Sequence, residues 1–274
     1  RRRRRERSNY FRNGIDMTGW QDLDDELNAW AGDGRRAGLW WRDDDAAEDS
    51  PALRRLLGLV GGDAPPLVMA VIPATLSDAA AQLIGAGAAA QCWVVQHGYT
   101  HANHARENEK KIELGGSHPS ELCENQLRAG QAILSARFAN QFLPALVPPW
   151  NRIAPELIPR LPALGYGAIS TYGAREATAP ENGLKRINCH VDILNWRQGA
   201  AFLGEAEALT LACNHLAARR GGRADGGEPT GLLSHHLQQD EAAWRFLAEF
   251  LARTSDHPGA EWVDPAMLFG RGAA

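Results

Sequence analysis

Short apolar runs that alternate with helical patterns constrain the fold of this 274-residue chain more than any other feature. Leu67–Ile72, Cys92–Gln96 and Leu143–Val147 each have the length of a strand and few polar residues. Such runs are typical of strands that helices cover on both faces, as in parallel sheets. The helical patterns at 77–87 and 120–138 supply the crossovers that parallel strands need. The sequence therefore predicts an α/β fold with functional groups at the carboxyl ends of its strands.

The same rhythm extends over most of the chain. Periodicity and capping residues predict further helices at 18–32, 50–60, 154–164, 205–219 and 241–252. Further strands are predicted at 37–42, 167–171, 188–193 and 231–234. No internal repeat divides this order, so we expect a single domain over residues 17–274.

Charge is unevenly distributed along the chain. Residues 1–16 contain seven arginines and two acids, whereas the whole chain has a net charge of -4. A block of like charge without an apolar pattern is typical of a disordered tail, which we predict for residues 1–16. The remainder is acidic, which argues against nucleic acid as a partner.

The sequence has no pattern typical of a membrane protein, a secreted protein or a zinc ribbon. No apolar run reaches the ~20 residues of a membrane span, and no apolar core of a signal peptide follows the arginines. We therefore expect no membrane partner and a cytoplasmic location. The four cysteines have no CxxC spacing, which excludes a zinc ribbon and argues against a disulfide framework. The sequence does not indicate the oligomeric state.

Two polar motifs follow predicted strands. Asp43, Asp44 and Asp45 come after the first strand, and their mutual repulsion is costly unless a cation or an arginine neutralises it. His97 and His101 come after a later strand, at a spacing that lets both imidazoles face one metal ion. Two histidines and one aspartate leave coordination positions open, as a catalytic metal site requires.

Each motif also has an interpretation without catalysis. Acids before a helix stabilise its N-terminus, although one acid suffices for that. A pair of histidines at this spacing also arises by chance in a chain with nine histidines. His104, three residues after the pair, is an alternative third ligand in place of Asp45.

The order of these motifs resembles that of the polysaccharide deacetylase family, the NodB-homology domain of carbohydrate esterase family 4. The resemblance rests on the acidic pair, the HxxxH motif, the loop Pro148–Asn151, an Asp-containing segment and the final Leu233–His235. It extends from Leu39 to Leu251 and implies a distorted (β/α)7-type barrel of mainly parallel strands. It also implies a divalent metal at the carboxyl-end face, with Zn²⁺ as the first expectation.

Carried over by position, the resemblance implies a role for each residue of the metal site. Asp44 becomes the general base and Asp45 a metal ligand, together with His97 and His101. The register is open by one residue, because Asp43 and Asp44 become the pair if the strand ends one position earlier.

The remaining motifs imply the acid and the substrate contacts. His235 takes the role of general acid, with His236 as the rival. The candidates for substrate binding are Trp150, Asn151, His190 and Asp192. The ordinary alternatives are a proline-rigidified turn that buries the tryptophan, and a buried polar pair on the strand.

Two positions depart from the family pattern and indicate a divergent member. The family has an arginine that orients the base before its Pro-rich motif, where this chain has Val147; Arg42 or Arg152 could replace it. After the first histidine of HxxxH the family has Ser or Thr, and this chain has Gly98.

The function expected from these motifs is metal-dependent removal of an acetyl group from an N-acetylated sugar or related amide. The partner would be an acetylated carbohydrate or a small amide. Two alternatives are hydrolysis of a non-sugar C–N amide bond on the same barrel and a catalytically silent carbohydrate-binding barrel. The missing motif arginine keeps the silent barrel open, whereas the retained base, ligands and terminal histidine argue against it.

Overall fold

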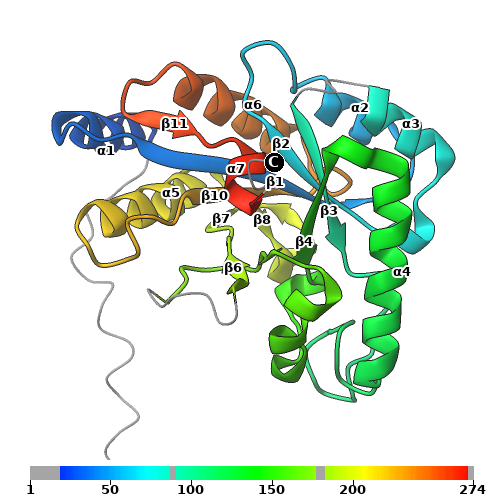
Figure 1. Ribbon diagram of the computed structural model, residues 1–274. Helices are drawn as coiled ribbons and strands as arrows, with labels where there is room; N and C mark the ends of the chain where they lie inside the picture. Colours follow the sequence, from blue (N-terminus) through cyan, green and yellow to red (C-terminus); the bar gives the residue numbers. More distant parts are fainter. Residues whose placement is uncertain (1–18, 87–90, 177–182, 271–274) are drawn as a thin grey trace, which may run out of the picture.

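The computed structural model describes residues 19–86, 91–176 and 183–270 (Figure 1). The predicted disordered tail at 1–16 lies outside these ranges. The helices are α1 (Trp20–Gly32), α2 (Pro51–Leu57), α3 (Asp78–Ala86), α4 (Ser120–Phe138), α5 (Glu205–Arg220), α6 (Glu241–Ser255) and α7 (Pro265–Phe269). The strands of the main sheet are β1 (Ala37–Ala46), β2 (Leu67–Val71), β3 (Cys92–His97), β4 (Phe142–Val147), β5 (Ala168–Ile169), β6 (Lys185–Arg186), β7 (Val191–Asp192), β10 (Thr230–Ser234) and β11 (Ala260–Trp262).

The main sheet is parallel throughout and has the order β6-β5-β4-β3-β2-β1-β10-β7, with β11 beside the start of β1. It curls into a half-barrel with the longer helices on its outside (Figure 1). The prediction of a distorted α/β barrel of mainly parallel strands is confirmed. A small antiparallel pair, β8 (Leu194–Asn195) with β9 (Ala201–Phe202), lies apart from this sheet.

Several elements differ from the sequence prediction. The helix expected at 154–164 consists of two short 3₁₀ segments, Pro155–Arg160 and Pro162–Leu164, because prolines at 155, 159 and 162 cannot donate the bonds of a longer helix. The first strand continues beyond residue 42 to Ala46 and includes the acidic triplet. The elements β11 and α7 were not predicted at all.

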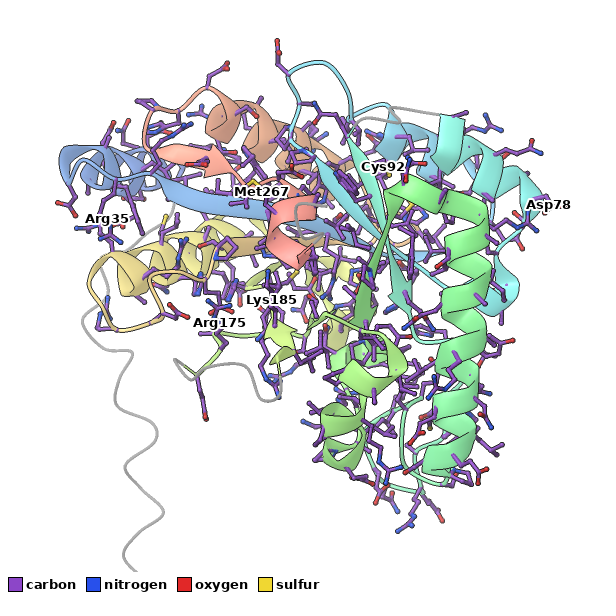
Figure 2. The ribbon with its side chains drawn as sticks, in the orientation of Figure 1. Arg35, Asp78, Cys92, Arg175, Lys185 and Met267 are labelled. Carbon is purple, nitrogen blue, oxygen red and sulfur yellow. The ribbon has the colours of Figure 1, made fainter. Side chains whose placement is uncertain are left out.

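Alternate residues of β1 enter two different cores. Leu39 and Trp41 pack with the outer helices, whereas Trp40 lies in the apolar interior of the half-barrel. Phe269 of α7 reaches the same interior, and its ring meets that of Trp40 edge-on at 5.4 Å between centroids. Side chains fill the space between sheet and helices, where Cys92 of β3 is buried (Figure 2). The two faces of β1 therefore have different surroundings, which decides where its polar end points.

Candidate metal centre and acid–base pair

A bulge at the end of β1 brings two neighbouring carboxylates to the same side. Side chains along a regular strand alternate between faces, so Asp44 faces the interior and Asp43 does not. Between Asp43 and Ala46, three steps along β1 match two along β2, and Asp45 has a left-handed backbone with φ 72°. The extra residue ends the alternation. Asp45 therefore lies beside Asp44, near the end of β3.

Asp45, His97 and His101 form a compact group of ligand atoms. Asp45 Oδ1 lies 3.1 Å from His97 Nε2 and 3.3 Å from His101 Nε2, and one ligand atom from each residue lies within 4.8 Å of the other two. Tetrahedral bonds of ~2.1 Å would hold such atoms about 3.4 Å apart, so the spacing fits a zinc-sized ion. His97 Nδ1–H donates to Val147 O at 3.0 Å, which leaves the Nε2 lone pair free for a ligand bond.

The electrostatics of this group keep Asp45 ionised and favour the charged form of His97, whereas burial and the charge of His97 lower the pKa of His101. Burial alone would raise the pKa of Asp45, yet the hydrogen bond and the charge of His97 hold it well below its usual range. Burial disfavours the charged form of His97, but Asp44 and then Asp45 raise the pKa of this imidazole. The side chains of Asp45 and His101 are 19% and 24% exposed, so the group is reachable from solvent. A divalent cation could replace the shared proton and keep open positions.

Arg42 binds the carboxylate of Asp44. Its Nε lies 2.8 Å from Asp44 Oδ1 as an ion pair, and its Nη2–H donates to Oδ2 at 3.0 Å. Two further donations, to Ser170 Oγ at 2.6 Å and to Asn151 Oδ1 at 2.8 Å, fix the guanidinium. Arg152 instead donates to Lys111 O. Of the two arginines considered as replacements for the family's arginine, Arg42 contacts the acid.

Asp43 lies on the other face of β1 in a closed network. Its carboxylate accepts hydrogen bonds from Ser234 Oγ at 2.6 Å and from the backbone N–H of His236 at 3.1 Å, and it pairs with the His236 ring. Burial opposes a charge on His236, but Asp43 raises the pKa of that ring. The rival residues of both motifs, Asp43 and His236, thus contact each other.

His235, the residue directly after β10, faces Asp44. Its Nε2 lies 3.9 Å from Asp44 Oδ2, and its ring meets the edge of Trp196 at 4.6 Å between centroids. Trp196 Nε1–H donates to Asp192 Oδ2 at 2.8 Å. Burial raises the pKa of Asp192, and the charge of His235 opposes that shift. Asp192 therefore supports the position of Trp196, a residue that the sequence prediction missed.

Trp150 and Asn151 flank the other side of the group. Both have left-handed backbones with φ 56°. The Trp150 ring lies 4.5 Å from the ring of His101, and Asn151 is held by Arg42. Their predicted role in substrate binding stays a prediction, with positions beside the candidate site that agree with it.

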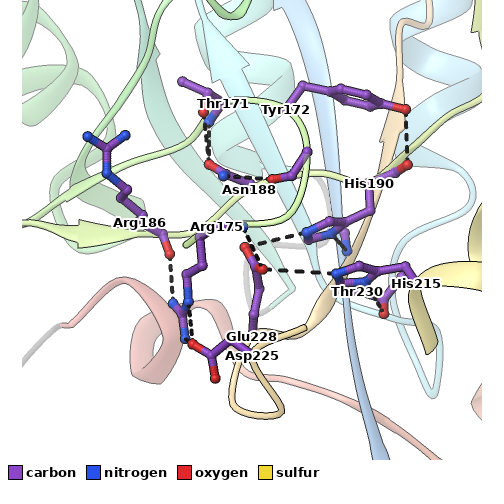
Figure 3. Close-up of polar contacts among 12 residues, drawn as sticks. Thr171, Tyr172, Arg175, Arg186, Asn188, His190, His215, Asp225, Glu228 and Thr230 are labelled. Carbon is purple, nitrogen blue, oxygen red and sulfur yellow. Dashed lines mark hydrogen bonds and ion pairs between the residues drawn. The ribbon is translucent and has the colours of Figure 1, made fainter. Parts of the chain in front are cut away.

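The structure does not bring His190 to this group. His190 lies in a second, buried group with His215 and Glu228 (Figure 3). Its Nε2 faces Glu228 Oε1 at 3.4 Å, and His215 Nε2 lies 3.9 Å from Glu228 Oε2. His104, the alternative third ligand, instead stacks its ring on that of His118 at 4.2 Å.

Glu113 is a buried acid near the metal group that the sequence prediction missed. Its carboxylate accepts hydrogen bonds from the loop between the two histidines of the HxxxH motif. The one signal in the sequence was Gly98, the departure from the family pattern. The sequence did not indicate which side chain fills the room that this glycine leaves.

The fold of the chain is that of carbohydrate deacetylases. A protein assigned as a polysaccharide deacetylase from Mycobacterium smegmatis is 18% identical with a TM-score of 0.59, covering 84% of this chain and 87% of that chain. A Streptococcus mutans carbohydrate esterase of family 4 is 9% identical with a TM-score of 0.56, covering 90% of each chain. The Bc1960 peptidoglycan N-acetylglucosamine deacetylase is 15% identical with a TM-score of 0.52, covering 85% of this chain and 88% of that chain.

Comparison by sequence, unlike comparison by structure, gives no match. No protein-family model matches it, and no curated protein matches it. At the identities found, the structural likeness defines the fold, and the chemistry has to be argued from the side chains. None of the helices within the described ranges combines the length and the apolar character needed to cross a membrane.

Proposed function

We propose that the protein is a metal-dependent hydrolase that removes an acetyl group from an N-acetylated sugar or a related amide. One observation carries the proposal: the group Asp45–His97–His101 lies beside an arginine-bound carboxylate, Asp44, and a histidine directly after β10 faces that carboxylate. The fold supports it, since solved proteins of this fold include a peptidoglycan N-acetylglucosamine deacetylase.

Asp45, His97 and His101 would hold the metal ion, with Zn²⁺ as our first expectation. When bound there, a divalent ion supplies Lewis acidity, which lowers the pKa of water and polarises a carbonyl oxygen. The three side chains leave room for water and substrate, as catalytic rather than structural zinc sites do.

Asp44 and His235 divide the proton transfers. Asp44 accepts a proton from the attacking water, and Arg42 keeps both oxygens of this carboxylate in place. His235 donates a proton to the amide nitrogen as the C–N bond breaks. The products are acetate, which contains the oxygen of the water, and a free amine.

Two tryptophans are the candidates for holding a sugar ring. Trp196 is 48% exposed beside His235, and Trp150 lies on the opposite side beside His101. Aromatic faces provide flat apolar surfaces against which a pyranose can pack. In this proposal the two rings would flank the scissile amide.

The test is acetate release from N-acetylglucosamine oligomers by protein purified without chelator. We expect bound metal by elemental analysis, acetate release, loss of release after chelation and recovery on addition of Zn²⁺. Release that survives complete metal removal would contradict the metal-dependent proposal. Cleavage of a non-sugar acetamide without acetate release from the oligomers would favour the small-amide alternative. Bound metal without any amide cleavage would favour the silent barrel.

A further inference from the structure

The loop that carries His101 is wrapped around the carboxylate of Glu113. Glu113 is fully buried. Its Oε1 accepts hydrogen bonds from the backbone N–H of Thr100 at 2.7 Å, from Thr100 Oγ1 at 2.9 Å and from the backbone N–H of His101 at 3.0 Å. The N–H of Tyr99 points at both oxygens at 3.2 Å. Three successive N–H groups directed at one anion form a nest, and here the anion belongs to the chain itself.

Gly98 is the residue that makes room for this carboxylate. It has φ +55°, and a Cβ built at this position would lie 1.8 Å from Glu113 Oε2 and 2.6 Å from Pro149 Cγ. A serine or threonine, as the resembling family has here, would therefore collide with the acid. The absence of a hydroxyl at 98 and the presence of a buried carboxylate at 113 are parts of one arrangement.

The backbone of His101 needs such support. His101 has φ 59°, a left-handed conformation that is sterically unfavourable for a residue other than glycine. Its N–H is bound by Glu113, and its Nε2 lies 3.3 Å from Asp45 Oδ1. The hydrogen bond therefore holds the backbone that aims the ring at the other two ligands.

We infer that Glu113 is a positioning residue of the metal site: it holds the His97–His101 loop from behind and thereby fixes His101 as a ligand. The inference rests on the proposed metal-dependent function. Partners behind metal ligands are worth about 10- to 100-fold in metal affinity when removed. Glu113 acts on the backbone of the ligand rather than on the second ring nitrogen, where such a partner is usually found.

The test is calorimetric titration of Zn²⁺ into metal-free protein, with the visible spectrum of the Co²⁺-loaded protein as a second readout. Glu113→Ala is expected to weaken Zn²⁺ binding about 10- to 100-fold and to change the Co²⁺ spectrum, because His101 no longer has a fixed position. Glu113→Gln keeps an acceptor at Oε1 and is expected to restore most of the affinity. Glu107→Gln removes one charge from an exposed position of the same loop and should bind as the wild type does.

The outcomes separate this inference from the proposed function. A wild-type protein that binds no Zn²⁺ overturns the function and the inference together. A folded Glu113→Ala variant with wild-type affinity and spectrum overturns the inference alone. If that variant does not fold, Glu113→Asp decides, since it keeps the charge but withdraws the carboxylate by one methylene; wild-type affinity in this variant also overturns the inference.

Discussion

The described part of the chain contains two groups that each consist of two histidines and one carboxylate. The groups differ in whether Nδ1 of a histidine faces a hydrogen-bond acceptor or a donor. In the group at the end of β3, His97 Nδ1–H donates to a carbonyl, so a neutral His97 would have its lone pair on Nε2, toward Asp45. In the buried group, the backbone N–H of Gly231 donates to His190 Nδ1 at 3.0 Å. A neutral His190 therefore carries its proton on Nε2, where it faces Glu228 and cannot bind a metal.

The surroundings of the buried group also disfavour a bound cation. His190, His215 and Glu228 are all buried, and His215 contacts Thr230 (Figure 3). Arg219 donates a hydrogen bond to the same Thr230 hydroxyl. A cation added there would meet an existing positive charge. The comparison teaches that residue types and spacing alone do not distinguish the two candidate groups, whereas the partner of the second ring nitrogen does, because it decides whether Nε2 can act as a ligand. We interpret the buried group as a structural cluster in which His215 of α5 and His190, the residue before β7, face Glu228 in the segment before β10.

The largest expected effect is on the amount of bound metal, which should depend on the first group and not on the second. Wild-type protein should bind one Zn²⁺ per chain, and His97→Ala should bind none, because two remaining ligands do not hold the ion. His190→Ala should still bind one, although the loss of a buried ring lowers stability. Elemental analysis after dialysis measures both. Two ions per wild-type chain, or loss of an ion in His190→Ala, would mean that the buried group also holds metal.

The next effect concerns the register within β1. Asp44→Asn should keep the metal and lower kcat about 10²- to 10⁴-fold, because the general base is removed. Asp45→Asn should lose metal affinity as well as activity. If Asp44→Asn empties the site while Asp45→Asn stays loaded, the two acids have exchanged roles. Acetate release and metal content, measured on the same samples, decide.

A smaller effect is expected for the arginine that binds the base. Arg42→Lys should lower kcat about 10- to 100-fold with metal retained, since an ammonium cannot bind both oxygens of Asp44 in a fixed plane. Arg152→Lys is the matched control and should remain near wild-type activity, because Arg152 contacts a backbone carbonyl instead. Equal losses in both variants would contradict the assigned partner of Asp44.

The smallest effect is on the pH dependence of the free energy of unfolding in metal-free protein. Burial, with the charges of His190 and Arg219, lowers the pKa of His215 to about 2, whereas the unfolded chain titrates near 6.5. The unfolded state therefore binds more protons below pH 6.5, and stability falls as pH falls from there. His215→Gln should make this fall shallower by up to about 1.4 kcal/mol per pH unit. Urea unfolding between pH 6 and 4 measures it, and parallel wild-type and variant curves would contradict it.

The positions of the strand ends could be predicted because apolar runs and turn residues mark them locally. The structure brings Asp45, His97 and His101 together as the sequence suggested, since the carboxyl ends of β1 and β3 meet at one edge of the sheet. Their roles as ligands stay a prediction. Strand parity with one bulge then determines that Asp43 turns away, and no local pattern reveals where a bulge falls.

Contacts between neighbouring residues of a strand can be predicted, whereas contacts between distant segments could not. Arg42 and Asp44 are two residues apart, so their side chains lie on the same face of β1 once the strand is known to continue. Glu113 meets Gly98 only because the long loop folds back on the HxxxH motif, and Trp196 reaches His235 from a segment without clear periodicity. Each of these depends on loop geometry that composition does not encode.

The left-handed backbone of Asp45 has a consequence for how this protein tolerates change. A sequence selected for folding alone would place glycine at the bulge, where the conformation carries no steric penalty. An aspartate there gives up some thermodynamic stability in exchange for a carboxylate aimed at the histidines. In the proposed function, position 45 is thus a site of compromise, where the most stable protein and one that binds metal require different amino acids.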